Sequence, residues 1–118
     1  MNEAFRAIGW TDLQAGALQE RILPFLTCVP EAAEEDWIVE WVATKPRYRG
    51  RGIMKQLLEA ILARGAERGH AQDQSGVLIG NTAAQRAYEG VGFRVVDEKT
   101  STPFEATFGI PGIRRMLR

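Results

Sequence analysis

Apolar residues recur at three- and four-residue intervals in two stretches of the chain, a spacing that predicts amphipathic helices. The first stretch covers residues 12–23, where Thr11 and Gln14 form a capping box at the start and Pro24 is expected to end the helix. The second runs from Gly52 to about Arg68, with an apolar stripe made of Ile53, Leu57, Leu58, Ile61 and Leu62. Gly65 lies inside the second helix and should weaken it by roughly 1 kcal/mol relative to alanine. Gly69 is the expected end of that helix.

Segments rich in β-branched and aromatic residues predict four strands. The clearest is residues 37–43, after a loop at 27–36; the others are 74–79, a strand beginning at 92–96, and 104–109. A short helix from Thr82 to about Glu89 should start with its own capping box in 82–85, and Pro111 and Gly112 should turn into a short basic tail. This order of strands and helices is typical of an α/β domain (α+β in some schemes) whose first crossover joins parallel strands.

The composition fits a single domain over residues 1–118. Its 15 basic and 15 acidic residues cancel, which argues against a nucleic-acid partner held by bulk charge. Cys28 is the only cysteine, so an intrachain disulfide and a multi-cysteine metal site are excluded, and we expect no metal. No apolar stretch near the start approaches the roughly 20 residues that span a bilayer, and the first ten residues lack a secretory pattern. We therefore expect a cytoplasmic protein with no membrane partner.

A glycine-rich turn between the clearest strand and the long helix is the candidate ligand site. Gly50 and Gly52 would let the backbone approach a ligand closely, and the unpaired N–H groups and dipole of a helix N-terminus favour an anion. Arg49 and Arg51 add positive charge. No Walker motif is present, and Lys55 stands where a Rossmann turn would have its third glycine. The alternative is that a helix merely starts after a glycine turn and the arginines are solvated.

Two motifs bear on this choice. Residues 42–53, Val-Ala-Thr-Lys-Pro-Arg-Tyr-Arg-Gly-Arg-Gly-Ile, resemble the acetyl-CoA signature of the GNAT acyltransferase superfamily, Gln/Arg-x-x-Gly-x-Gly/Ala. Residues 81–93 resemble the second signature of that family, Asn-x-x-Ala-x-x-x-Tyr-x-x-x-Gly-Phe. The resemblance covers about residues 37–110 and implies a GNAT-like mixed sheet flanked by helices. Met54 stands where Gly or Ala is usual, but its N–H would still donate from the first helical turn.

The segment before the first strand departs from the family. Only 36 residues precede this strand, where family members usually carry two or three strands and two helices. We therefore expect 1–36 to form a shortened helical front end, so that the chain resembles the C-terminal half of a longer enzyme. Trp37 and Trp41 would share one strand face with Val39, a face that the helix at 12–23 should partly cover. A homodimer is expected to complete the sheet or the acceptor pocket.

The resemblance implies roles for individual residues. The backbone at Val42, Ala43 and Thr44 would bind the pantetheine arm of acetyl-CoA, and an N–H near Ala43 would stabilise the thioester oxyanion. Tyr88 would protonate the leaving thiolate, unless it is a helix tyrosine packed on the core. Asn81 would meet the pantetheine if Thr82 caps the helix; alternatively, Asn81 is itself the cap. The pyrophosphate would be held by the N–H groups of Arg49, Gly50, Arg51, Gly52, Ile53 and Met54.

Glu40 lies in the middle of the predicted strand, on one face with Ile38 and Val42. An acidic side chain between two apolar ones is unusual and indicates a specific role. An amine arrives protonated, and removing that proton at pH 7 costs about 4–5 kcal/mol for a pKa of roughly 10.4. Glu40 is therefore the candidate base, unless it faces solvent on an open sheet. The expected function is an N-acetyltransferase that moves an acetyl group directly from acetyl-CoA to a primary amine. The alternative is a catalytically inactive CoA-binding or protein-interaction module of the same fold.

Overall fold

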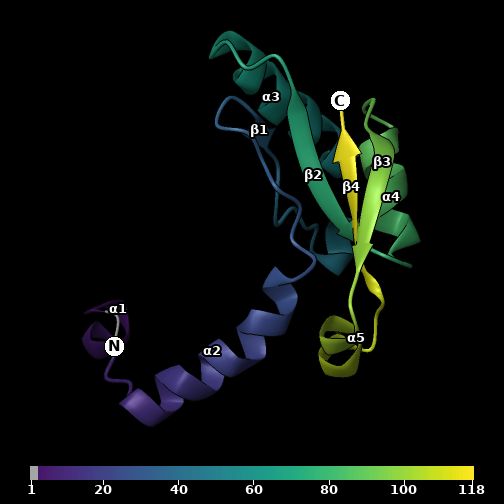
Figure 1. Cartoon of the computed structure of the whole chain (residues 1–118). Coiled ribbons are helices and arrows are strands. Elements are labelled where there is room, and N and C mark those ends of the chain that lie inside the picture. The colour runs from purple at the N-terminus through teal and green to yellow at the C-terminus, as the bar shows by residue number, and fades with distance from the viewer. Residues whose placement is uncertain (1–2) are drawn as a thin grey trace.

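The computed structural model describes residues 3–118, which form a four-stranded mixed sheet with helices on both faces (Figure 1). The sheet order is β1-β2-β4-β3, in which β1 and β2 are parallel and the other neighbours are antiparallel. The strands are β1 (Trp37–Ile38), β2 (Asp73–Leu78), β3 (Arg94–Thr100) and β4 (Gly112–Leu117). The helices are α1 (Glu3–Ala7), α2 (Asp12–Leu26), the 3-10 turn η1 (Pro46–Tyr48), α3 (Ile53–Glu67), α4 (Thr82–Glu89) and α5 (Thr102–Phe108).

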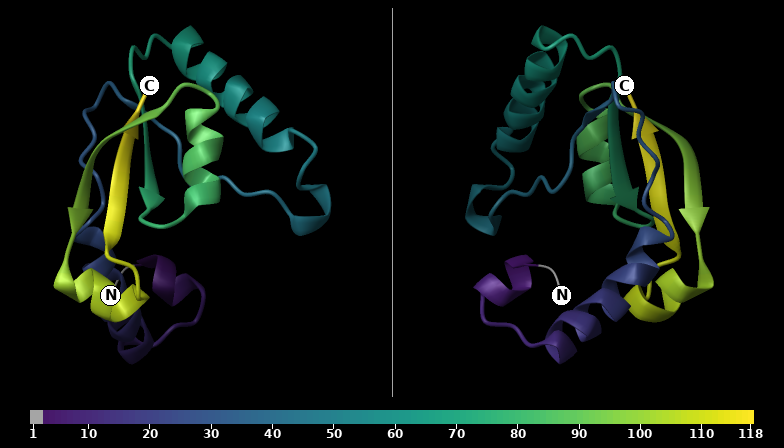
Figure 2. Two further views of the ribbon diagram at one scale, coloured as in Figure 1. Left: turned by 90° about the vertical axis from the view of Figure 1, so that its right-hand side faces the viewer. Right: turned by 60° about the vertical axis from the view of Figure 1, so that its left-hand side comes forward.

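The two faces of the sheet carry two separate cores, as the alternation of side chains along a strand requires. On one face, Val77 and Met116 pack with residues of α3 and α4, and Figure 2 shows both helices on this side. On the other face, Ile113 of β4 packs with Cys28 and with Phe104 of α5. The crossover through α3 joins two parallel strands, which confirms the predicted topology.

The strand predicted at 37–43 is much shorter than expected. Its pairing with β2 ends after Ile38, apart from a bond from the Val39 N–H to the Gln74 carbonyl. Trp41 then adopts a φ of 57°, which breaks the alternation. Val39 and Val42 consequently both contact the α3–α4 core, whereas Trp41 is 88% exposed. Trp37 and Val39 share a face, as expected, since both contact this core. The expectation that Trp41 shares that face is wrong, because the backbone turns over at Trp41.

The predicted strand at 104–109 is wrong as well, because these residues belong to α5. Ser101 caps that helix by accepting a bond from the Phe104 N–H, Pro103 lies in the first turn, and Gly109 ends it in the left-handed region. The expected basic tail is instead β4, which lies between β2 and β3 in the sheet. Arg114 and Arg115 of β4 form ion pairs with Glu98 and Asp97 of β3.

Helix α2 extends away from the sheet rather than covering it (Figure 1). Its capping box forms as predicted, with Thr11 and Gln14 bonded to each other, but the helix continues past Pro24 to Leu26. It is anchored at its C-terminal end, where the Phe25 ring stacks on Phe104. The radius of gyration is 16.6 Å, against about 13.5 Å for a compact chain of this length. The prediction that this helix covers the tryptophan face is wrong. Across residues 3–118, no helix is long and apolar enough to cross a bilayer.

Candidate functional site

The turn before α3 presents a row of free amide groups. Gly50 and Gly52 have φ angles of 74° and 72°, in the left-handed region that glycine adopts without strain. No acceptor among residues 3–118 bonds to the N–H groups of Gly50 through Lys55, and the turn is exposed, so these groups face solvent. A helix N-terminus with open N–H groups favours an anion. The predicted turn and the start of the helix are therefore both present.

The side chains around this turn leave a positive surface. Arg47 and Arg51 lie over the Tyr48 ring, at 4.7 and 5.7 Å from its centre. Arg49 donates from Nε to the Thr44 carbonyl at 3.1 Å, so its side chain braces the loop. The first turn of α3 has no acidic residue, and none of these arginines has a carboxylate partner within residues 3–118. The turn thus carries uncompensated positive charge.

The separation of β1 from β2 opens the backbone next to this turn. Asp73 of β2 forms two backbone hydrogen bonds with Arg118, and the Ile79 N–H donates to the Gly112 carbonyl. Every second residue of β2 therefore directs its backbone groups toward β4. Gly76 therefore directs its backbone toward the β1 side, where the pairing has already ended. Within the described chain, the N–H groups of residues 40–44 also have no partner. The N–H groups of Val42, Ala43 and Thr44 are thus unpaired within the described chain, although the Thr44 carbonyl accepts from Arg49.

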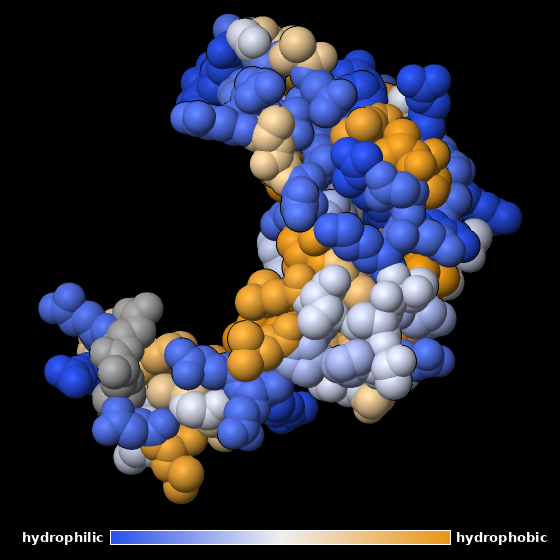
Figure 3. Space-filling model, in the orientation of Figure 1, coloured by the Kyte–Doolittle hydropathy of each residue, from blue (hydrophilic) through white to orange (hydrophobic). Residues whose placement is uncertain are grey.

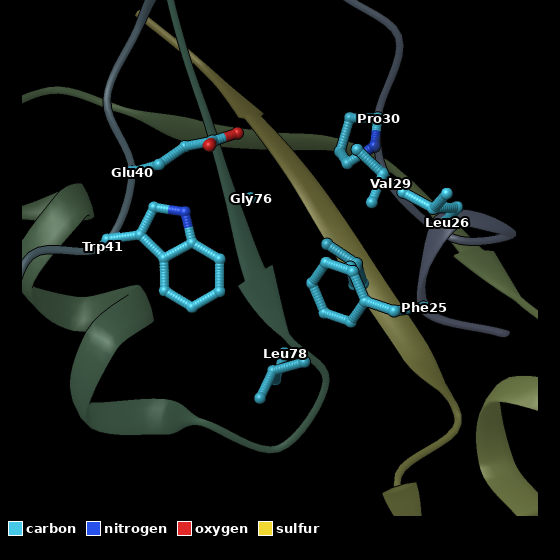
Figure 4. Close-up of a pocket in the computed structure, with 9 residues that line it drawn as sticks. Phe25, Leu26, Val29, Pro30, Glu40, Trp41, Gly76 and Leu78 are labelled. Carbon is cyan, nitrogen blue, oxygen red and sulfur yellow. The ribbon is translucent and has the colours of Figure 1, made fainter. Parts of the chain in front are cut away.

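A cleft of about 370 Å³ lies on the other face of the sheet, at the point where β1 leaves β2. Figure 4 shows Glu40 and Trp41 on one wall, Phe25 and Pro30 on the opposite wall, and Gly76 between them. The complete lining is Phe25, Leu26, Val29, Pro30, Glu40, Trp41, Gly76, Leu78 and Ile113. Glu40 lines this cleft and is also exposed, so the alternative of a solvent-facing residue on an open sheet stays open. The expectation that Glu40 shares a face with Val42 is wrong, because Val42 packs on the α3–α4 core.

Tyr88 of α4 lies on the opposite face from this cleft. It is 7% exposed and packs edge-to-face on Phe93, with 5.3 Å between the ring centres. The same core contains Val39, next to the point where β1 and β2 separate. The hydroxyl forms no hydrogen bond with any part of residues 3–118. The ring therefore has the packing of a core tyrosine, and its hydroxyl has no competing partner among the described residues.

Asn81 caps α4 itself. Its Oδ1 accepts from the Ala84 N–H at 3.2 Å, whereas the Thr82 hydroxyl contacts the Gly80 carbonyl at 3.5 Å. The capping box predicted for 82–85 is therefore wrong. Asparagine can accept the bond one position earlier, so the cap falls on Asn81. Of the remaining predicted residues, Ile53 is exposed at the start of α3, and Met54 packs on the core.

The sequence model of the acetyltransferase (GNAT) family matches residues 8–93. The chain belongs to this family. Known structures share its fold, which confirms the GNAT-like architecture. An IAA acetyltransferase from Bacillus cereus has a TM-score of 0.64 at 17% identity, over 74% of this chain and 63% of that one. The ribosomal-protein-S18-alanine N-acetyltransferase from Escherichia coli gives 0.57 at 22% identity, over 76% and 57% of the two chains. A GCN5-related N-acetyltransferase from Kribbella flavida gives 0.61 at 23%, over 76% and 54%.

The GNAT chain spans about half to two thirds of the length of the structures that it matches. Comparison with curated proteins gives no match. Members of this family use acetyl-CoA, the ligand that the first motif predicts.

The residues of the cleft beyond Glu40 and Trp41 were not predicted. Phe25 and Pro30 precede β1, whereas Leu78 ends β2, and nothing in their spacing links them. They are ordinary apolar residues that meet only because α5 holds the end of α2 against the sheet. The motifs of this GNAT chain therefore indicated the backbone site and left the cleft undetected.

Proposed function

We propose that this GNAT domain binds acetyl-CoA and transfers its acetyl group directly to a primary amine. The observation that carries the proposal is the run of unpaired N–H groups from Gly50 through Lys55 at the start of α3. A diphosphate needs several donors in a small space, and consecutive backbone N–H groups supply them without a side chain in the way. Arg47 and Arg51 add charge that no carboxylate of residues 3–118 neutralises.

The residues present fit the rest of the ligand. The unpaired backbone of Val42, Ala43 and Thr44 offers N–H groups to an extended pantetheine arm, as a neighbouring strand would. The Asn81 Oδ1 accepts the capping hydrogen bond of α4, so the side-chain amide nitrogen of Asn81 is the group left for the ligand. When bound, acetyl-CoA supplies an acetyl group activated as a thioester. The N–H near Ala43 would then stabilise negative charge on the thioester oxygen.

The two candidate catalytic side chains, Glu40 and Tyr88, lie on opposite faces of the sheet, and Tyr88 packs in one core with Val39, the neighbour of Glu40. Glu40 lines the cleft and accepts a proton from the incoming ammonium group, so that the amine nitrogen can attack. A C–N bond forms and the C–S bond breaks. The Tyr88 hydroxyl, which makes no bond within the described chain, gives its proton to the leaving sulfur. The acylated nitrogen then loses its remaining extra proton to the tyrosinate, which leaves a neutral amide, a free thiol and Tyr88 restored.

We also propose that the chain forms a homodimer. Helix α2 exposes Leu13, Leu23 and Leu26 at 84%, 60% and 56%, and Figure 3 shows apolar surface along the hollow that this helix borders. Of these residues, Leu23 and Leu26 lie together with Ile22 on one side of the helix, and an exposed apolar surface of this kind is typical of an interface. Light scattering at micromolar concentration should give twice the chain mass; a clean monomer would contradict this part of the proposal.

Calorimetry with acetyl-CoA, followed by thiol release with a panel of primary amines, tests the proposed reaction. Saturable binding and amine-dependent release of CoA are expected. Binding without release from any amine would favour the inactive CoA-binding module instead. Absence of binding would overturn both CoA-dependent interpretations.

A further inference from the structure

We propose that the cleft between β1 and α2 selects a small amine with an apolar or aromatic body and no carboxylate. Its ammonium group would lie at Glu40 and its apolar part between Phe25, Pro30 and Leu78. The role of this amine as acetyl acceptor rests on the proposed function, whereas its binding preference can be measured without acetyl-CoA.

The chemistry of the lining supports this ligand class. Of the described residues that line the cleft, Glu40 alone is ionisable, and the others are apolar, aromatic or glycine. A single carboxylate among apolar groups attracts a cation that carries apolar surface. Arg115 extends on the same sheet face, but Asp97 holds its guanidinium at 2.9 Å. A ligand carboxylate would therefore find no cation among the lining residues and would be repelled by Glu40; Lys99, which pairs with Ile113, lies on the same face but outside the lining.

Trp41 gives an independent indication that this wall is a binding surface. Within residues 3–118 it is the single non-glycine residue with a positive φ, 57°, and its side chain is 88% exposed. A bulky side chain in this region is strained, and such strain concentrates at ligand sites. The strain is imposed from both sides, since Val39 is fixed to β2 and Val42 packs on the core. The result turns a large aromatic ring toward the cleft beside Glu40 (Figure 4).

The size of the cleft limits the ligand to a small one. Its volume of about 370 Å³ is near the lower end of small-molecule sites, which span roughly 300–1,000 Å³. Gly76 forms the floor: a Cβ at this position would come within 3.2 Å of Ile113 and 3.5 Å of Pro30. The absence of a side chain there keeps the space between the two walls open. The cleft thus suits one aromatic or branched group and its amine.

The test compares four probes by calorimetry on the full chain. Phenethylamine has the apolar body and the charge, 2-phenylethanol lacks the charge, phenylalanine adds a carboxylate, and ethanolamine lacks the body. Phenethylamine should bind about tenfold more tightly than each of the others, equivalent to about 1.4 kcal/mol. Glu40→Gln should abolish its advantage over 2-phenylethanol. Glu34→Gln, at an exposed loop carboxylate outside the lining, should leave the advantage unchanged.

Other results would overturn the inference. These are equal binding of phenylalanine or ethanolamine, a preference that survives Glu40→Gln, or no binding of phenethylamine. The wild-type comparison among probes decides the matter even if a variant fails to fold. A separate acetyl-CoA titration distinguishes the two proposals. If acetyl-CoA binds but the amine preference is absent, only the ligand class fails; if the preference is present but acetyl-CoA does not bind, only the proposed transfer fails.

Discussion

The indole of Trp37 in β1 packs directly against Gly65 in α3. A Cβ at Gly65 would lie 2.7 Å from ring atoms of Trp37, closer than any real contact allows. The Trp37 Nε1 also donates to the Ile61 carbonyl, one turn earlier in α3, at 3.1 Å. The glycine that weakens α3 locally is therefore what allows β1 and α3 to approach each other.

Alanine should act in opposite directions at two helical glycines. Gly65→Ala forces the Trp37 ring to move and should lower the free energy of unfolding by roughly 1–3 kcal/mol, as overpacked core sites do. Gly16→Ala in α2 meets nothing within 4 Å and should stabilise by up to about 1 kcal/mol through helix propensity alone. Urea unfolding of both variants measures the difference. Equal effects at the two sites would show that the Trp37 contact does not limit packing.

Gly52→Ala should impair acetyl-CoA binding more than it impairs folding. Gly52 and Gly69 flank the two ends of α3 with φ angles of 72° and 87°, and a Cβ at either would meet nothing within 4 Å. Alanine at either position should therefore cost a similar amount, about 1–2 kcal/mol. Only Gly52→Ala places a methyl group beside the unpaired N–H groups, so only this variant should lose about tenfold in affinity, or 1.4 kcal/mol. Calorimetry combined with thermal unfolding separates the two effects. Comparable affinity losses in both variants would contradict the assignment of the turn.

Tyr88→Phe should reduce turnover while the fold is retained. The variant keeps the ring that packs on Phe93 and removes a hydroxyl with no bond inside residues 3–118. Loss of a general acid typically costs about 100-fold or more in kcat, and the melting temperature should hardly change. Thiol-release kinetics on folded protein provide the measurement. Full activity in Tyr88→Phe would assign this tyrosine to the core alone.

The ion pair between Asp97 of β3 and Arg115 of β4 should make the free energy of unfolding depend on pH in the acid range. The hydrogen bond from Arg115 lowers the pKa of Asp97 below its usual value of 3.8. A lowered pKa in the folded state means that the stabilisation is fully present above the unfolded pKa and is lost as pH falls through the folded one. Wild type should thus exceed Asp97→Asn in urea midpoint at pH 7 by a small margin that disappears on acidification below the usual pKa. A margin that persists unchanged in acid would exclude the carboxylate as its source.

The sequence predicted best the elements whose signals are local. The helix after Gly52, the capping box at Thr11 and the parallel crossover follow from spacing and cap chemistry over a few residues. The motif around Gly50 was recognised because the conformation of its glycines and the start of a helix are also local properties.

The errors arose where tertiary contacts decide. The β-branched and aromatic residues at 37–43 favour a strand, but they do not show that Val42 packs on the same core as Val39. That packing requires the backbone to turn at Trp41. The α5 error was avoidable, because Ser101, Pro103 and Gly109 are start and stop signals that outweigh the β-propensity between them. The cleft had no local signal, since its walls come from segments far apart in the sequence.

Backbone amide spectra recorded during titration with acetyl-CoA test the central claim most directly. The ¹H–¹⁵N resonances of Gly50 through Lys55 should show the largest downfield proton shifts, because their N–H groups pass from water to a diphosphate, and the amides of residues 42–44 should follow. Saturable shifts confined to other parts of the chain, or none at all, would contradict the account.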